Sequence, residues 1–189
     1  MKSRSALVVF LLQTFLAFSQ DKLLPEIKKG VSLSYQVSVN GQLFPVLMKF
    51  DSVSPDYNRI SWSMPDGSGG NVVNTKVSLD NATKGYWGQL PNGSDLTLPS
   101  DQTVLVLSKT LWTAIQKDKK FTFDDLQFTV KEQPADAIFK LKEKALNVVY
   151  AESSNAAVRM WILNSPTVPI LVKIEGNPMG IDIFLESID

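Results

Sequence analysis

The stretch that decides the fold is residues 30–50, GVSLSYQVSVNGQLFPVLMKF. Asn40-Gly41 is the preferred pair for a two-residue type I′ turn, in which both central residues adopt positive φ. Such a turn fixes the register, so that Val39 faces Gln42 and apolar residues face each other at every second step outward. These apolar pairs are Val37 with Phe44, Tyr35 with Val46, Leu33 with Met48 and Val31 with Phe50. The stretch therefore predicts a β-hairpin with one apolar face.

The opposite face of this hairpin is mixed and more wettable, with Ser38 opposite Leu43 and Gln36 opposite Pro45. Proline has no N–H, and in this register the missing donor points away from the first strand. We therefore expect the second strand to be an edge, or to be bulged, near Pro45.

Short alternating segments recur along the rest of the chain, with turn residues between them. They comprise residues 59–64, 73–79, 126–130, 146–150, 158–162, 170–174 and 181–188, a continuous apolar run at 104–107 and a short strand or turn at 138–141. Asn92-Gly93 in PNGSD is a second hairpin turn signal. This spacing predicts a mainly β fold, a single antiparallel meander of about ten strands. Such a sheet buries one face by curving into a half-barrel, a barrel or a sandwich.

One short α-helix is expected near residues 109–118. Ser108 can cap its N-terminus, and Leu111, Trp112, Ala114 and Ile115 form one apolar stripe. We expect Trp112 to pack in the core rather than to contact a ligand. The helix is suited to plug the open end of a curved sheet or to cover one of its faces.

The chain opens with the features of a signal peptide. Lys2 and Arg4 precede an apolar run that is too short to span a bilayer, and small residues precede a cleavage site after Ser19. The alternative, a buried N-terminal helix, is disfavoured because basic residues at its start oppose the helix dipole. We expect residues 1–19 to be removed, residues 20–29 to form a polar lead-in, and residues 30–189 to form a single β-rich domain.

Localisation and partners follow from composition. The sequence has no cysteine, so the signal is not of the lipoprotein type, and the protein is expected to be secreted or periplasmic. Removal of Lys2 and Arg4 takes the net charge from zero to −2. Without a basic cluster, binding to nucleic acid is not expected. No second apolar stretch of spanning length follows the signal, so no transmembrane segment is expected after its removal.

The residue inventory argues against catalysis. Histidine and cysteine are both absent, which removes the usual nucleophilic triads and zinc sites. Asp124-Asp125 is interpreted as a structural turn, and the loops around Asp66 and Asp95 lack the ligand spacing of a calcium loop. The glycine-rich segment 65–70 lacks the Lys and following helix of a phosphate loop. We expect no catalytic residue, no metal site and no cofactor.

The candidate ligand-binding residues are Tyr86 and Trp87. They lie between two glycines in GYWGQL, where a loop or strand end could present aromatic surface to a sugar ring or an acyl chain. The alternative is that Trp87 turns into the core, as is expected of Trp62 and Trp161.

Three segments carry a resemblance to known proteins: the signal end Ser19-Gln20, TVLVLSKTLWTAI (103–115), and WILNSPTVPILVKIEGN (161–177). In these, the chain resembles a broad set of uncharacterised secreted bacterial β-rich proteins. The expected curved sheet with a helix against it is similar to the half-barrel of periplasmic lipoprotein carriers. That second resemblance is one of fold.

These observations favour a secreted or periplasmic, non-catalytic binding module for an apolar or lipid-like ligand. The first alternative is an envelope structural or adaptor protein that pairs with an envelope protein through the strand edge near Pro45. The second is a carboxylate-dependent glycan hydrolase, which needs two acidic side chains in a cleft.

Overall fold

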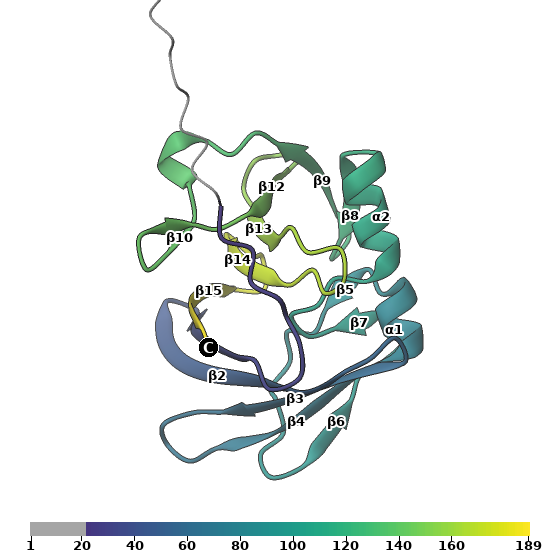
Figure 1. The fold of residues 1–189 in the computed structure, drawn as a ribbon, viewed down its shortest axis with the longest axis vertical. Coiled ribbons are helices and arrows are strands. Elements are labelled where there is room, and N and C mark those ends of the chain that lie inside the picture. Colours follow the sequence, from purple (N-terminus) through teal and green to yellow (C-terminus); the bar gives the residue numbers. More distant parts are fainter. Residues whose placement is uncertain (1–21) are drawn as a thin grey trace, which may run out of the picture.

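The computed structural model describes residues 22–189, so the predicted signal peptide at 1–19 lies outside the described residues. The fold is mainly β, as predicted, with 49% of the described residues in strands and 11% in helices. Eleven strands form one sheet in the order β6-β4-β3-β2-β1-β15-β14-β13-β12-β9-β8 (Figure 1). Within residues 22–189 this sheet is not closed, since β6 and β8 lie at its two ends.

The predicted hairpin is present in the predicted register. It consists of β1 (Ser32–Val39) and β2 (Gln42–Val53). Asn40 and Gly41 have φ of 51° and 85°, as a type I′ turn requires. Val37 pairs with Phe44 and Tyr35 with Val46, so turn chemistry and apolar alternation led to the correct register.

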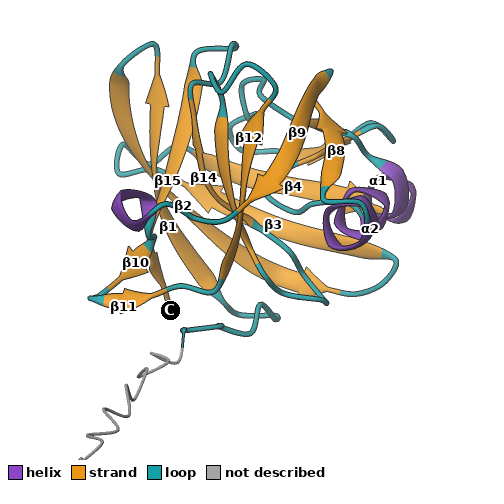
Figure 2. Ribbon diagram, turned by 90° about the horizontal axis from the view of Figure 1, so that it is seen from above, coloured by secondary structure: helices purple, strands orange, loops and turns teal. Residues whose placement is uncertain are grey.

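Ten of the eleven strands in the described sheet form two antiparallel meanders, which β1 joins by pairing with the last strand, and the eleventh is a short parallel strand at one end. The first meander continues with β3 (Tyr57–Ser63) and β4 (Gly69–Thr75). The second contains β8 (Lys120–Phe123), β9 (Leu126–Lys131), β12 (Val148–Ser153), β13 (Arg159–Leu163), β14 (Leu171–Glu175) and β15 (Ile181–Ile188). Figure 2 shows these strands from above, with the two helices beyond one side of the sheet.

Shorter elements lie outside the meanders. They are β5 (Lys84–Gly85) with β7 (Gln102–Thr103), β10 (Lys140–Leu141) with β11 (Lys144–Ala145), and the 3-10 helix η1 (Ala135–Ala137). The described part of the polar lead-in is attached to this region, because Leu23 bridges to Leu146 and Ile27 is buried.

Within residues 22–189 two α-helices are present, α1 (Lys76–Asn81) and α2 (Lys109–Lys117). The second confirms the predicted helix, and the Ser108 hydroxyl accepts a hydrogen bond from the Leu111 N–H at 3.2 Å. The first corrects the sequence analysis, which placed residues 73–79 in one strand. The strand ends at Thr75 because its hydroxyl caps a helix by accepting the Ser78 N–H at 3.3 Å, and Val77 is 54% exposed.

The helices lie between the two ends of the sheet. Helix α1 contacts β4 and α2, and α2 contacts β8 (Figure 1). In the described sheet, β4 is next to the strand at one end, and β8 is the strand at the other end. The two helices therefore bridge the gap between the two ends of the sheet. The sheet and the helices thus enclose a common interior. Neither helix in residues 22–189 is long and apolar enough to cross a membrane.

Two further sequence expectations were wrong. Residues 104–107 do not form a strand, because Leu105 has φ of 61° and only Val106 bridges to Ile170. Asn92-Gly93 does not close a hairpin. The strand that follows, β6 (Asp95–Thr97), pairs in parallel with β4.

As expected, β2 has an open edge near Pro45. Pairing of β2 with β3 begins at Leu47, which leaves the outer edge of residues 42–46 without a partner strand within the described sheet. Farther along β2 the register shifts between Phe50 and Ser52.

Candidate functional site

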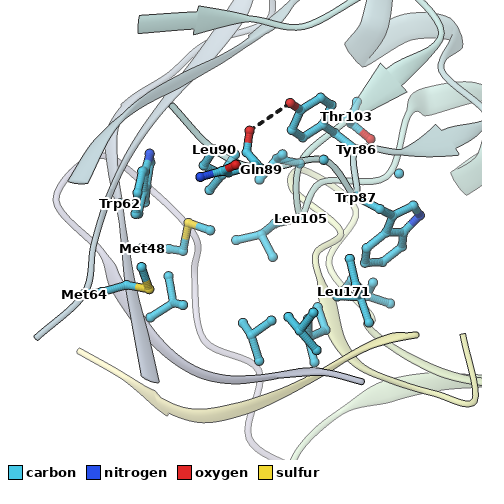
Figure 3. Close-up of a pocket in the computed structure, with 18 of the residues that line it drawn as sticks. Met48, Trp62, Met64, Tyr86, Trp87, Gln89, Leu90, Thr103, Leu105 and Leu171 are labelled. Atoms are coloured by element: carbon cyan, nitrogen blue, oxygen red, sulfur yellow. Dashed lines mark hydrogen bonds between the residues drawn. The ribbon is translucent and has the colours of Figure 1, made fainter. Parts of the chain in front are cut away.

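A cavity of about 460 Å³ lies against the apolar face of the β1–β2 hairpin (Figure 3). One wall comes from β1, β2, β3 and the residue after β3, and consists of Val37, Val39, Val46, Met48, Trp62 and Met64. Ile181 and Ile183 of β15 extend this wall, because they pair with Val39 and Val37. The other wall comes from residues 85–90 and 103–107, with Phe123 and Leu171. Exposed or half-exposed polar residues mark its mouth: Asp66, Ser68, Gln89 and Asn92.

The first wall is the apolar face that the sequence predicts for the hairpin. Val37 and Val46 lie on this face, and Met48 pairs directly with Trp62 of β3. Because side chains alternate across each strand, these residues all project to the same side of the sheet. Figure 3 shows Met48, Trp62 and Met64 together along one side of the cavity.

Tyr86 and Trp87, the candidate residues from sequence, both line the opposite wall. Their rings fold back over the flanking glycines. A Cβ atom at Gly85 would lie 2.7 Å from the Trp87 ring, and one at Gly88 would lie 2.7 Å from the Tyr86 hydroxyl oxygen. Glycine is therefore required on both sides of Tyr86-Trp87, because any side chain at either glycine would displace an aromatic ring.

Trp87 is held by Asp124, in the turn between β8 and β9. Its Nε1–H donates to Oδ2 of Asp124 at 2.7 Å, and the Gly85 N–H donates to Oδ1 at 2.9 Å. The ring also packs edge-on against Phe123, with centroids 6.5 Å apart. Burial raises the pKa of the Asp124 carboxyl, and the two hydrogen bonds oppose that rise.

The sequence predicts a structural turn at Asp124 but gives no sign of the contact with Trp87. Both Asp124 and Asp125 have positive φ, of 49° and 62°, so the turn itself is confirmed. The contact with Trp87 spans 37 positions in the chain. No local pattern signals a pairing at that distance.

Tyr86 is anchored through its own polar groups. Its hydroxyl donates to the Gln89 carbonyl at 3.1 Å, and its backbone N–H donates to the Thr103 carbonyl at 2.9 Å (Figure 3). The polar hydrogens of both candidate aromatic residues are thus used within the protein. The rings themselves contribute apolar surface to the cavity.

Leu105 lies between the two walls in Figure 3. Its positive φ is strained for a residue with a branched side chain, and such strain persists only where neighbouring contacts fix the backbone. Here the Leu105 carbonyl accepts the Leu171 N–H at 2.7 Å. The preceding residue, Val104, is held by the buried Asn74 amide, which accepts its N–H at 2.9 Å.

Asp66 and Asp95, whose loops were considered as calcium sites, form hydrogen bonds and an ion pair within the protein. Asp66 accepts hydrogen bonds from the N–H and hydroxyl of Ser68, and these lower the pKa of its carboxyl. Asp95 pairs with Arg59 at 2.9 Å and accepts the Asn71 amide at 2.8 Å. Among residues 22–189, no group of three or more acidic, histidine or cysteine side chains could hold a metal ion.

Comparison with known proteins adds no assignment to this geometry. No protein-family model matches the chain, and a search of curated proteins finds no match to it.

Proposed function

We propose that this protein is a non-catalytic binding module that holds an apolar, lipid-like small molecule in the cavity between β1–β3 and residues 85–107. The observation that carries the proposal is the cavity itself. Its volume of about 460 Å³ falls within the range of about 300–1,000 Å³ that is typical of small-molecule sites. Its walls are aliphatic, aromatic and thioether side chains.

The way the second wall is held supports this proposal. Protein interiors normally pack with few voids larger than a water molecule. Here Trp87 is fixed by Asp124, and Leu105 is fixed in a strained conformation by its hydrogen bond to Leu171. These contacts prevent the two residues from collapsing into the space in front of Met48 and Trp62.

The two alternatives from sequence have weaker support. A glycan hydrolase needs a pair of carboxyl groups flanking the substrate, and within residues 22–189 Asp66 is the one acidic residue that lines this cavity. Pairing through the β2 edge would use residues 42–46, where Pro45 removes a donor that a neighbouring strand would need. We therefore favour ligand binding over both.

A fluorescence titration with N-phenylnaphthylamine, an uncharged apolar dye, tests the proposal. We expect saturable binding by the wild-type protein and weaker binding by Val37→Trp, because the larger ring fills space in the first wall. Leu43→Trp is the matched control. It adds the same ring to the same hairpin on the other face, where Leu43 is 65% exposed, and it should leave dye affinity unchanged.

No saturable binding by folded wild-type protein, or equal loss in both variants, would contradict the proposal. Native mass spectrometry of protein purified without detergent gives a second readout, in which a bound apolar molecule should accompany the wild-type chain and be reduced in Val37→Trp.

The proposed location is the periplasm or the extracellular space, on the basis of the N-terminal sequence. Intact-mass measurement of the protein recovered from an exporting host should give a chain that begins at Gln20. A chain that retains residues 1–19 in the cytoplasmic fraction would contradict export.

A further inference from the structure

We propose that the cavity selects amphiphiles by head-group charge, favouring cationic over uncharged and uncharged over anionic head groups, with Asp66 as the selecting residue. This inference rests on the proposed binding of an apolar ligand in the same cavity. It adds the chemical class of the ligand's head group, which is the part that reaches the mouth of the cavity.

The charge of the cavity lining favours a cationic head group. Among the described residues that line the cavity, Asp66 is the one with a formal charge, and no Lys or Arg is present. Its pKa is lowered by the hydrogen bonds from Ser68, so it is ionised at neutral pH. An acidic head group at this mouth would meet a like charge without a lysine or arginine in the lining to offset it.

The hydrogen-bonding groups at the cavity favour a head group that donates. Both contacts from Ser68 go to Oδ1 of Asp66, which leaves Oδ2 able to accept from an ammonium or hydroxyl head group. The aromatic donors of the opposite wall are already engaged, since Trp87 donates to Asp124 and Tyr86 donates to the Gln89 carbonyl. The Trp62 N–H is buried without a hydrogen-bond partner among the described residues, and it lies against Gly70 at the end of its ring away from Met48 and Met64 (Figure 3).

Three ligands with the same alkyl chain test the inference: decylamine, decanol and decanoate, each measured by displacement of N-phenylnaphthylamine at neutral pH and low ionic strength. Because Asp66 is exposed, the expected effect is modest. Attraction of the ammonium and repulsion of the carboxylate should together separate decylamine from decanoate by about tenfold. This separation should shrink at high salt, which screens exposed charges.

Asp66→Asn keeps an acceptor for the Ser68 N–H and removes the charge. It should reduce the separation to about twofold and leave decanol affinity unchanged. Asp56→Asn is the control, because Asp56 lies in the turn at the other end of β3 and does not line the cavity. Gln89→Lys places a positive charge at the mouth and should strengthen decanoate binding by about two- to fivefold.

Decanoate binding as tightly as decylamine, or a separation that persists in Asp66→Asn, would overturn the inference while leaving the proposed function intact. An unchanged decanoate affinity in Gln89→Lys would also overturn the inference and leave the proposed function intact. Failure of all three ligands to displace the dye would instead count against the proposed function.

Discussion

At the scale of single residues, the contact that organises the second wall is the one between Trp87 and Asp124. One carboxylate accepts both the indole N–H of Trp87 and the backbone N–H of Gly85. It therefore fixes both the ring and the end of β5, two residues before Trp87. Its two oxygens hold two separate groups, so this carboxyl is well suited to hold an aromatic wall in place.

Asp124→Asn should loosen this wall. The amide keeps one acceptor oxygen but presents NH₂ to the other donor, so one of the two hydrogen bonds is lost. We expect the free energy of unfolding to fall by about 1 kcal/mol and dye affinity to fall several-fold, measured by urea unfolding and by titration.

Asp125→Asn is a close control for this change. The residue sits in the same turn, also with positive φ, and its 83% exposed side chain pairs only with Lys84 at 3.2 Å. It should change stability by no more than about 0.5 kcal/mol. Equal effects of the two substitutions would show that Trp87 does not depend on Asp124.

The raised pKa of Asp124 also predicts a pH dependence of stability. Because the carboxyl binds its proton more tightly in the folded state, it contributes stability that grows as pH falls through its raised pKa. This gain is complete below the unfolded value near 3.8. Urea unfolding at neutral pH and at about pH 4 should therefore show the wild type gaining stability relative to Asp124→Asn. A constant difference between the two proteins would contradict this assignment.

At the scale of elements, Ser108 connects the two helices that bridge the ends of the sheet. Its hydroxyl oxygen accepts the Leu111 N–H at the start of α2, and its O–H donates to the Ala82 carbonyl at the end of α1, at 2.6 Å. Helix α1 has six residues and α2 has nine. Helices this short depend on caps and packing rather than on intrinsic propensity.

Ser108→Ala should destabilise the protein by about 1–3 kcal/mol, because it removes an N-cap and leaves the Ala82 carbonyl without its partner. Thr113→Ala is the control, since it removes an exposed hydroxyl from the same helix and should change stability by less than about 0.5 kcal/mol. Urea unfolding of both variants measures the difference. A loss in Ser108→Ala no larger than in Thr113→Ala would contradict a bridging role for Ser108.

At the scale of the whole molecule, ligand binding and folding are coupled, because the cavity is built from segments distant in the chain. A ligand that binds only the folded state at a hundred times its Kd adds about 2.7 kcal/mol of stability. For a protein of this size that corresponds to a rise in Tm of roughly 5–10 °C.

Decylamine, the ligand expected to bind best, should produce this rise in a thermal unfolding experiment with the wild-type protein. Val37→Trp should show a smaller rise at the same ligand concentration, whereas Leu43→Trp should match the wild type. A ligand that binds by titration but leaves Tm unchanged would contradict a site formed by the folded chain.

Several features could be predicted from sequence because neighbouring residues encode them. The register of residues 31–50 followed from the Asn40-Gly41 turn and the alternation beside it, and α2 followed from its cap and its apolar stripe. Residues 73–79 were misassigned because alternation at Val77 and Leu79 resembled a strand, whereas the cap at Thr75 begins a helix there. Tyr86 and Trp87 were selected from their setting between glycines, and the structure places both on the cavity wall.

By itself the sequence determined the β class, the central hairpin and the main helix, since these depend on turn chemistry and periodicity over short distances. Only the tertiary structure decided that the two meanders join through β1 and β15, that the helices bridge the open side, and that Asp124 holds Trp87. It also decided that a cavity lies between the two walls, with Asp66 as the one charged residue among the described residues that line it. The physical reason is that these features arise from contacts between residues far apart in the chain, which no local pattern of side chains specifies.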